Sequence, residues 1–270
     1  MAQERKARAA GATAVLLERP LAPRSLIASL LLGMRPPRLS AGRLVEWCGL
    51  FGVAEGTVRV ALSRMLDRGE LTATDGVYEL AGRLRGRQPT QEWSLAPRPK
   101  QWDGDWLLGI VDAGARTANE RAALREAGRR LRMVELRDGV WSRPDNLPRR
   151  AAPADAWDVA DAQCAWWTGR PDPESLVDVI QGFGADEWAA RARALRDRLQ
   201  ASTAALDGAD GATIADAFTV GAAALAHVRG DPLLPAELCG RDWPGGALRD
   251  AYGEYRSAFA GAVRDWFRSP

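Results

Sequence analysis

The sequence has few of the residues that build metal centres, disulfide-linked folds and hydrolase active sites. It contains one histidine, His227, and three widely separated cysteines, Cys48, Cys164 and Cys239. These numbers exclude histidine-rich zinc sites and indicate neither a disulfide framework nor a thiolate metal cluster. A Ser-His-Asp triad would have a single candidate base, and neither a G-x-S-x-G motif nor a Walker-type phosphate loop is found. We therefore expect no catalytic residues, no metal and no cofactor.

Long apolar runs are also missing. A membrane-spanning helix needs roughly 20 apolar residues, and the alanine-rich stretch 211–228 is interrupted by Asp216. Segment 1–20 is basic and alanine-rich, but its short apolar run stops at Glu18, which argues against a secretory signal. We expect a flexible tail at residues 1–20 and a cytoplasmic protein.

The net charge of +2 is small but unevenly distributed. Residues 1–100 contain 16 Lys/Arg and 9 Asp/Glu, a net charge of +7, whereas residues 101–270 contain 21 and 26, a net charge of −5. A basic front part can neutralise phosphates, and an acidic rear part would be repelled by them. The charge pattern therefore predicts a division of labour, with nucleic-acid binding at the front.

Residues 24–80 show the pattern of three helices followed by a hairpin. Ser40 is a suitable N-cap for the second helix, and Asp75-Gly76 is a strong two-residue hairpin signal. This order is typical of a winged helix-turn-helix DNA-binding domain, which we assign to residues 21–96. The expected elements are helices at 24–33, 40–52 and 55–68, and strands at 71–74 and 77–80.

The third helix is the candidate recognition helix. Val58, Leu62 and Met65 share one face, which we expect to be buried. The opposite face carries short and basic side chains. This composition favours contact with the major groove of DNA over the alternative, an ordinary solvated helix face. We expect DNA contacts from Gly56, Thr57, Arg59, Val60, Ser63 and Arg64, and further DNA contacts, mainly to phosphates, from Arg35, Arg38, Arg43 and Arg68.

The rest of the chain changes from mixed to helical patterns. A buried strand at 106–113 is followed by a helix with a capping box at Thr117 and Glu120, two strands around Asp138-Gly139, and a strand at 163–168. These elements predict a small α+β domain. Four further helices are expected, at 174–180, 186–206, 213–228 and 247–267. The whole is an α+β multidomain protein.

Three ordered motifs resemble the PaaX family of bacterial transcriptional repressors, named after the regulator of phenylacetic acid breakdown. They are GTVRVALSRMLDRGEL at 56–71, the stretch 102–147 from WDGDWLLGIVDA to GVWSRPDNL, and HVRGDPLLPAELCGRDWPG at 227–245. The resemblance implies a ferredoxin-like dimerisation domain at 97–170 and a helical C-terminal domain at 171–270 that binds an effector. It also implies repression relieved by a small molecule, such as an acyl- or aryl-coenzyme A thioester.

The chain departs from the family pattern at two positions of the third helix. Ala54 replaces a polar cap, and Gly56 replaces a longer polar residue. Each change costs a helix about 1 kcal/mol, so packing must hold this helix in place.

We expect a homodimer that binds double-stranded DNA at a palindromic operator. The candidate effector-binding residues are Trp141, Trp166, His227 and Trp243, although core packing is the commoner role for such side chains.

Two other functions remain open. Asp112 ends the first central strand, where a similar aspartate occurs in ferredoxin-like CRISPR-associated endonucleases, so a metal-dependent nuclease is the main alternative. Cleavage would need more carboxylates around one metal pair, and only Asp103 and Asp105 lie nearby in the sequence. A protein-interaction adaptor with a vestigial winged helix is the third, and it predicts no salt-dependent DNA binding.

Overall fold

A computed structural model describes residues 21–34, 36–85, 87–112, 114, 116–149 and 154–268. The expected tail at 1–20 and the candidate residue Arg35 lie outside the described residues. The expected α+β class is confirmed, since two small sheets are accompanied by a helical C-terminal region.

The chain forms two compact units. The first comprises Met1–Pro89, Ala194–Leu225 and Asp250–Pro270, and the second comprises Thr90–Arg193 and Ala226–Arg249. The division into three domains along the sequence stays a prediction.

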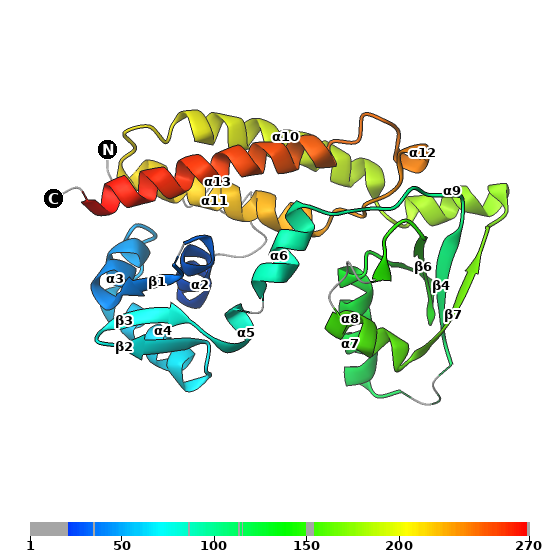
Figure 1. Ribbon diagram of the computed structural model, residues 1–270, viewed down its shortest axis with the longest axis horizontal. Helices are drawn as coiled ribbons and strands as arrows, with labels where there is room; N and C mark the ends of the chain where they lie inside the picture. Colours follow the sequence, from blue (N-terminus) through cyan, green and yellow to red (C-terminus); the bar gives the residue numbers. More distant parts are fainter. Residues whose placement is uncertain are drawn as a thin grey trace. The chain divides into compact units, whose positions relative to one another are not determined.

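The first unit begins with three helices and a three-stranded antiparallel sheet, followed by a fourth, short helix (Figure 1). The predicted helices and hairpin strands are confirmed, and the sheet gains a strand, β1, that was not predicted. β1 pairs with β3, giving the strand order β1-β3-β2. The elements are α2 (Pro23–Gly33), β1 (Arg38–Ser40), α3 (Ala41–Gly49), α4 (Glu55–Asp67), β2 (Leu71–Thr74), β3 (Val77–Leu80) and α5 (Gly82–Arg85).

Local sequence accounts for where these elements begin and turn. The hydroxyl oxygen of Ser40 accepts a hydrogen bond from the backbone N–H of Arg43 at 3.4 Å, which caps α3. Asp75 and Gly76 have φ angles of 50° and 74°, and left-handed backbone at both central residues is what a two-residue hairpin turn requires. The Asp-Gly pair therefore fixes the hairpin.

Aromatic side chains join α3 to helices near the C-terminus within the first unit. The Trp47 indole is fully buried and makes edge contacts with Phe218 at 5.1 Å and Phe259 at 6.2 Å between ring centroids. These phenylalanines belong to α11 (Gly211–Arg229) and α13 (Gly245–Arg268). Parts of the C-terminal region therefore share a hydrophobic core with the N-terminal helices.

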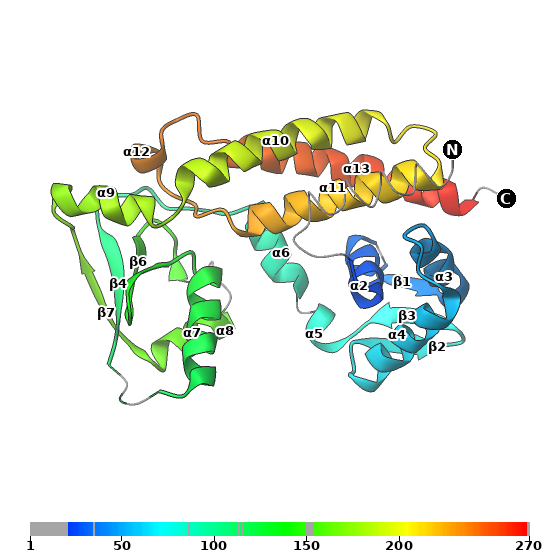
Figure 2. The same cartoon turned by 180° about the vertical axis from the view of Figure 1, so that it is seen from behind.

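The second unit contains a four-stranded antiparallel sheet with strand order β5-β6-β4-β7. Helices α7 and α8 cover one face of this sheet (Figure 2). The capping box at Thr117 and Glu120 is confirmed at the start of α7, whereas α8 was not predicted. The elements are α6 (Arg87–Leu95), β4 (Trp106–Val111), α7 (Ala118–Arg130), β5 (Val134–Arg137), β6 (Val140–Pro144), α8 (Ala154–Asp161), β7 (Cys164–Gly169), α9 (Pro173–Gln181) and α12 (Ala236–Cys239).

The remaining predicted helices are confirmed as α9, α10 (Ala185–Ala204), α11 and α13. Within the described residues, α11 is long and apolar enough to cross a membrane by length and composition, and half of the apolar stretch is buried inside the protein. Core helices of soluble proteins meet the same criterion, so this feature is weak evidence for a membrane span.

Trp141 is a large side chain in the core between the four-stranded sheet and helices α7 and α8. This indole is buried, and a Cβ atom at Gly128 of α7 would overlap its ring. On the same face of the sheet, a Cβ atom at Gly109 of β4 would lie 2.7 Å from the ring of Trp166. The two glycines therefore let large aromatic rings approach the backbone closely.

Replacing Gly128 with alanine should destabilise the protein by about 1–3 kcal/mol, because the added methyl group overpacks the core against Trp141. Gly253→Ala in α13 is the matched control, since nothing lies within 4 Å of its would-be Cβ atom. The control should gain up to about 1 kcal/mol from helix propensity. Urea unfolding of both variants measures the difference, and equal effects at the two sites would contradict this account.

Candidate nucleic-acid interface

One face of α4 is buried against its neighbours. Val58, Leu62 and Met65 are at most 2% exposed, as the sequence predicted, and α4 packs on α2 and α3. Ala54 precedes the helix and makes no side-chain capping hydrogen bond. Packing by these three side chains, rather than capping, therefore fixes both the position of the helix and its rotation about its axis.

The opposite face of α4 is exposed. Gly56, Thr57 and Ser63 are short, and nothing lies within 4 Å of the position that a Cβ atom at Gly56 would take. The six predicted contact residues all lie on this exposed face: Gly56, Thr57, Arg59, Val60, Ser63 and Arg64. Their contact with DNA stays a prediction.

The two arginines of this face differ in their surroundings. Arg59 pairs with Glu55 one turn earlier, with 2.7 Å between Nη2 and Oε1, and both side chains are more than half exposed. An exposed pair at this spacing contributes only about 0.3–0.5 kcal/mol, so another anion can replace the carboxylate. The side chain of Arg64, by contrast, makes no ion pair or hydrogen bond with any other described residue. Arg64 is therefore the readier partner for a phosphate or a guanine.

The other basic candidates lie in different environments. Arg68 is exposed directly after α4, and Arg38 is exposed on β1, opposite Glu79 of β3. Arg43 pairs with Glu46 at 3.0 Å, and its guanidinium carbon lies 5.0 Å from the ring centroid of Phe267. Arg43 therefore contacts the C-terminal segment, a role that the sequence did not predict.

The four effector candidates fall into two groups in the second unit. Trp141 and Trp166 lie on the helix-covered face of the sheet, where Trp166 donates a hydrogen bond to Asp161 at 2.7 Å. His227 and Trp243 instead each stack on Trp188, with centroid distances of 4.6 and 4.8 Å and nearly parallel rings. The structure thus brings two of the four candidates together around Trp188, which the sequence did not single out.

His227 is held in this stack by a hydrogen bond. Its Nε2 atom lies 2.9 Å from the carbonyl oxygen of Trp188, to which it donates as the Nε2–H tautomer. Burial lowers the pKa of His227 below its ordinary value, and the charges of Arg191 and Asp231 act in opposite directions. The folded protein therefore favours the neutral imidazole.

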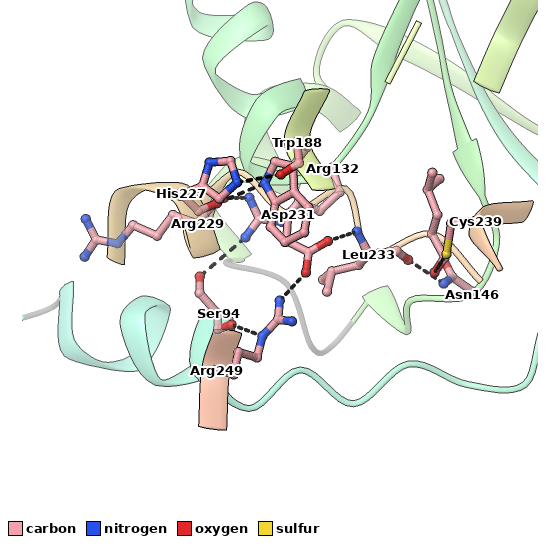
Figure 3. Close-up of polar contacts among 11 residues, drawn as sticks. Ser94, Arg132, Asn146, Trp188, His227, Arg229, Asp231, Leu233, Cys239 and Arg249 are labelled. Atoms are coloured by element: carbon pink, nitrogen blue, oxygen red, sulfur yellow. Dashed lines mark hydrogen bonds and ion pairs between the residues drawn. The ribbon is translucent and has the colours of Figure 1, made fainter. Parts of the chain in front are cut away.

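A buried ion pair lies close to this stack (Figure 3). Asp231 is fully buried, and its Oδ2 atom lies 2.7 Å from Nη2 of Arg249. Its Oδ1 atom accepts a hydrogen bond of 2.9 Å from the backbone N–H of Leu233, a residue with the unusual φ of 54°. Asn146 donates to the Leu233 carbonyl oxygen at 2.8 Å. Asp231 thus fixes the strained turn of the D-P-L-L-P segment, which explains why an aspartate occurs among prolines and leucines.

Arg132 adds a second buried guanidinium to this cluster. It donates hydrogen bonds to the carbonyl oxygen of Arg229 and to the hydroxyl of Ser94 (Figure 3). Its guanidinium carbon also lies 5.2 Å from the ring centroid of Trp93. Burial lowers the pKa of Arg132 to about 10, so the group is still a cation at neutral pH. This role could not be predicted from the sequence, because Arg132 lies just after a helix among other arginines.

A family model described as PaaX-like protein matches residues 22–84. The structure is similar to that of the uncharacterized protein Rv0674 from Mycobacterium tuberculosis, with 35% sequence identity, a TM-score of 0.70, and coverage of 92% of this chain and 100% of that one. The chain belongs to the PaaX-like family. No curated protein matches the sequence. The PaaX-like family is generally regulatory rather than enzymatic, which is consistent with a transcriptional regulator.

The carboxylates that a nuclease would need around one metal site do not lie together in this PaaX-like protein. Asp105 directly precedes β4 and Asp112 directly follows it, so six residues of about 3.4 Å each separate them. Asp105 is also paired with Arg170 at 2.9 Å. Within the described residues, no group of three or more histidine, cysteine or acidic side chains is placed to hold a metal ion. The nuclease alternative therefore has no support.

Asp231→Asn should lower the free energy of unfolding by about 3–5 kcal/mol, because it leaves Arg249 buried without a counter-charge while keeping the shape of the side chain. Glu126→Gln removes one carboxylate from a surface pair with Arg129 and should cost less than about 1 kcal/mol. Denaturant titration compares the two variants. A similar small loss for both would show that the Asp231 pair is not structurally important.

Stability should fall as the pH drops below about 6.5, because the unfolded chain then binds a proton that folded His227 disfavours. His227 is the only histidine in the sequence. His227→Phe, which keeps a ring beside Trp188, should therefore remove most of this dependence of stability on pH, that is, the slope of stability against pH. Apparent melting temperatures between about pH 8 and pH 5.5 measure it. A slope that persists unchanged in the variant would assign the effect to other groups.

Proposed function

We propose that this PaaX-like protein is a sequence-specific DNA-binding transcriptional regulator that acts as a repressor. In this proposal, α2 to β3 form a winged helix-turn-helix in which α4 is the recognition helix and the β2–β3 hairpin is the wing. The observation that carries the proposal is the exposed, short-chained and basic face of α4, held in place by a fully buried stripe on its other side.

The dimensions and chemistry of this face suit duplex DNA. A helix is about 10–12 Å across and the major groove is about 12 Å wide, so a helix whose exposed side chains are short can approach the base edges. Arg64 is long enough for a guanine or a phosphate, and the exposed Arg68 directly after the helix and Arg38 on β1 are candidates for phosphate contacts. Phosphate contacts would orient the domain, and the side chains of α4 would provide specificity.

The remaining parts of the proposal concern assembly and regulation. We propose a cytoplasmic homodimer on a palindromic operator, with a ferredoxin-like dimerisation domain whose strand–helix–strand–strand–helix–strand order is that of β4 to β7. An acyl- or aryl-coenzyme A thioester would relieve repression if it binds the non-DNA-binding state more tightly. Of the four effector candidates, His227 and Trp243 are the better ones, because they are only partly buried, whereas Trp141 belongs to a core and Trp166 packs against the same core.

Duplex DNA should bind the protein with an affinity that falls steeply as salt rises, and Arg64→Ala should weaken binding at least threefold. If Arg64 contacts a phosphate, the slope of log affinity against log salt should fall by about 0.9, whereas a guanine contact would lower affinity on selected sequences by about 1–3 kcal/mol. Fluorescence anisotropy with duplexes selected from a random library measures both.

Arg125→Ala is the matched control, because Arg125 is an exposed arginine in the middle of helix α7. Its affinity and salt slope should equal those of the unaltered protein. Binding that is insensitive to salt in the unaltered protein would refute DNA binding, and an unaffected Arg64→Ala variant would refute the assigned face of α4.

A further inference from the structure

Val60 is an exposed apolar side chain at the centre of a polar and basic surface. Its exposure is 50%, although Val58 and Leu62 on the other face of α4 are buried. It lies one turn after Gly56 and Thr57 and one turn before Ser63 and Arg64. The central position of the proposed DNA-contacting face is therefore occupied by two methyl groups.

The folded chain gains little from a valine at this position. A β-branched residue is a poorer helix former than alanine, because its side chain loses rotamer freedom against the preceding turn. An exposed side chain also recovers little free energy from burial. Neither helix formation nor core packing accounts for Val60, which leaves its methyl groups free to contact another molecule.

The neighbouring residues leave the Val60 methyl groups accessible. Gly56 has no side chain, and the space beside it is open to at least 4 Å. Thr57 and Ser63 are both short. Along the row formed by Thr57, Val60 and Ser63, a flat surface that approaches α4 would meet the Val60 methyl groups without first meeting a longer side chain.

We infer that Val60 is a specificity-determining residue that contacts the 5-methyl group of a thymine in the major groove. This inference rests on the proposed function. Thymine is the base that presents an apolar group in the major groove, where the other base edges carry hydrogen-bond donors and acceptors. A short apolar side chain can pack against that methyl group. It disfavours a polar base edge, because it would remove water from the edge without supplying a hydrogen bond in return.

The test removes the 5-methyl group of thymine from the DNA and the methyl groups of Val60 from the protein in separate experiments. Duplexes are first selected from a random library with the full-length protein, and each thymine of the best duplex is then replaced singly by deoxyuridine, which lacks only the 5-methyl group. At one thymine, the replacement should weaken binding about fourfold, the factor that corresponds to burial of one methylene-sized group. Val60→Ala should weaken binding to the thymine duplex by a similar factor and should bind both duplexes equally.

Val177→Ala is the matched control, because Val177 is a 57% exposed valine in helix α9, outside the proposed interface. It should keep the unaltered protein's preference for thymine over deoxyuridine. Val60→Ala should fold normally, with an unchanged or slightly raised melting temperature, because alanine is the better helix former.

Three results would overturn the inference. Equal binding of thymine and deoxyuridine duplexes at every position by the unaltered protein, or a preference that survives in Val60→Ala, would leave the proposed function intact and refute the contact. A Val60→Ala variant with altered oligomeric state and unchanged thymine preference would place Val60 against a second copy of the chain. Absence of any salt-dependent duplex binding would refute the proposed function together with the inference.

Discussion

The burial of Val58, Leu62 and Met65 is the constraint on which the candidate interface depends. These side chains occupy one face of α4, and successive residues of a helix are rotated by about 100°. Once they are packed against α2 and α3, the direction of every other side chain of α4 is set. The helix has no side-chain cap at Ala54, so tertiary packing provides the order that its own end does not.

The packing under α4 continues into the C-terminal part of the chain. α3 contacts α4 on one side, and its Trp47 indole meets Phe218 and Phe259 on the other. Arg43, at the start of the same helix, lies over the ring of Phe267. The core of the candidate DNA-contacting module therefore extends into the C-terminal helices, since its second helix also packs on residues more than 160 positions later in the sequence. A change in α11 or α13 can alter the position of α3, and with it the support of α4.

The motifs that identify the family differ in what they do physically. The motif at 56–71 provides a buried stripe and an exposed face, and the exposed face is the part that can contact DNA. The motif at 227–245 contains Asp231, which neutralises Arg249 and fixes the turn at Leu233. Its His227 and Trp243 rings stack on Trp188. Much of that motif is therefore explained by folding, and a shared motif is not by itself evidence of ligand contacts.

The sequence by itself determined the elements whose signals are local. Ser40, the Asp75-Gly76 pair and the Thr117–Glu120 capping box act through neighbouring backbone groups, and the spacing of Val58, Leu62 and Met65 defines a helix face. The exposed face of α4 could be predicted for the same reason. The strand β1 could not, because three residues carry almost no periodicity and pair only when β3 is beside them.

Only the tertiary structure decided which distant side chains meet. The contacts of Trp47 with Phe218, of Trp188 with His227 and Trp243, and of Asp231 with Arg249 join residues separated by 18 to 171 positions. Nothing in the composition of either segment specifies such a partner, because burial and charge neutralisation depend on three-dimensional proximity rather than on sequence order. For the same reason Arg43, Arg59 and Arg64, which are equivalent as cations in the sequence, differ in the structure: the first contacts Phe267, the second pairs with Glu55, and the third faces solvent.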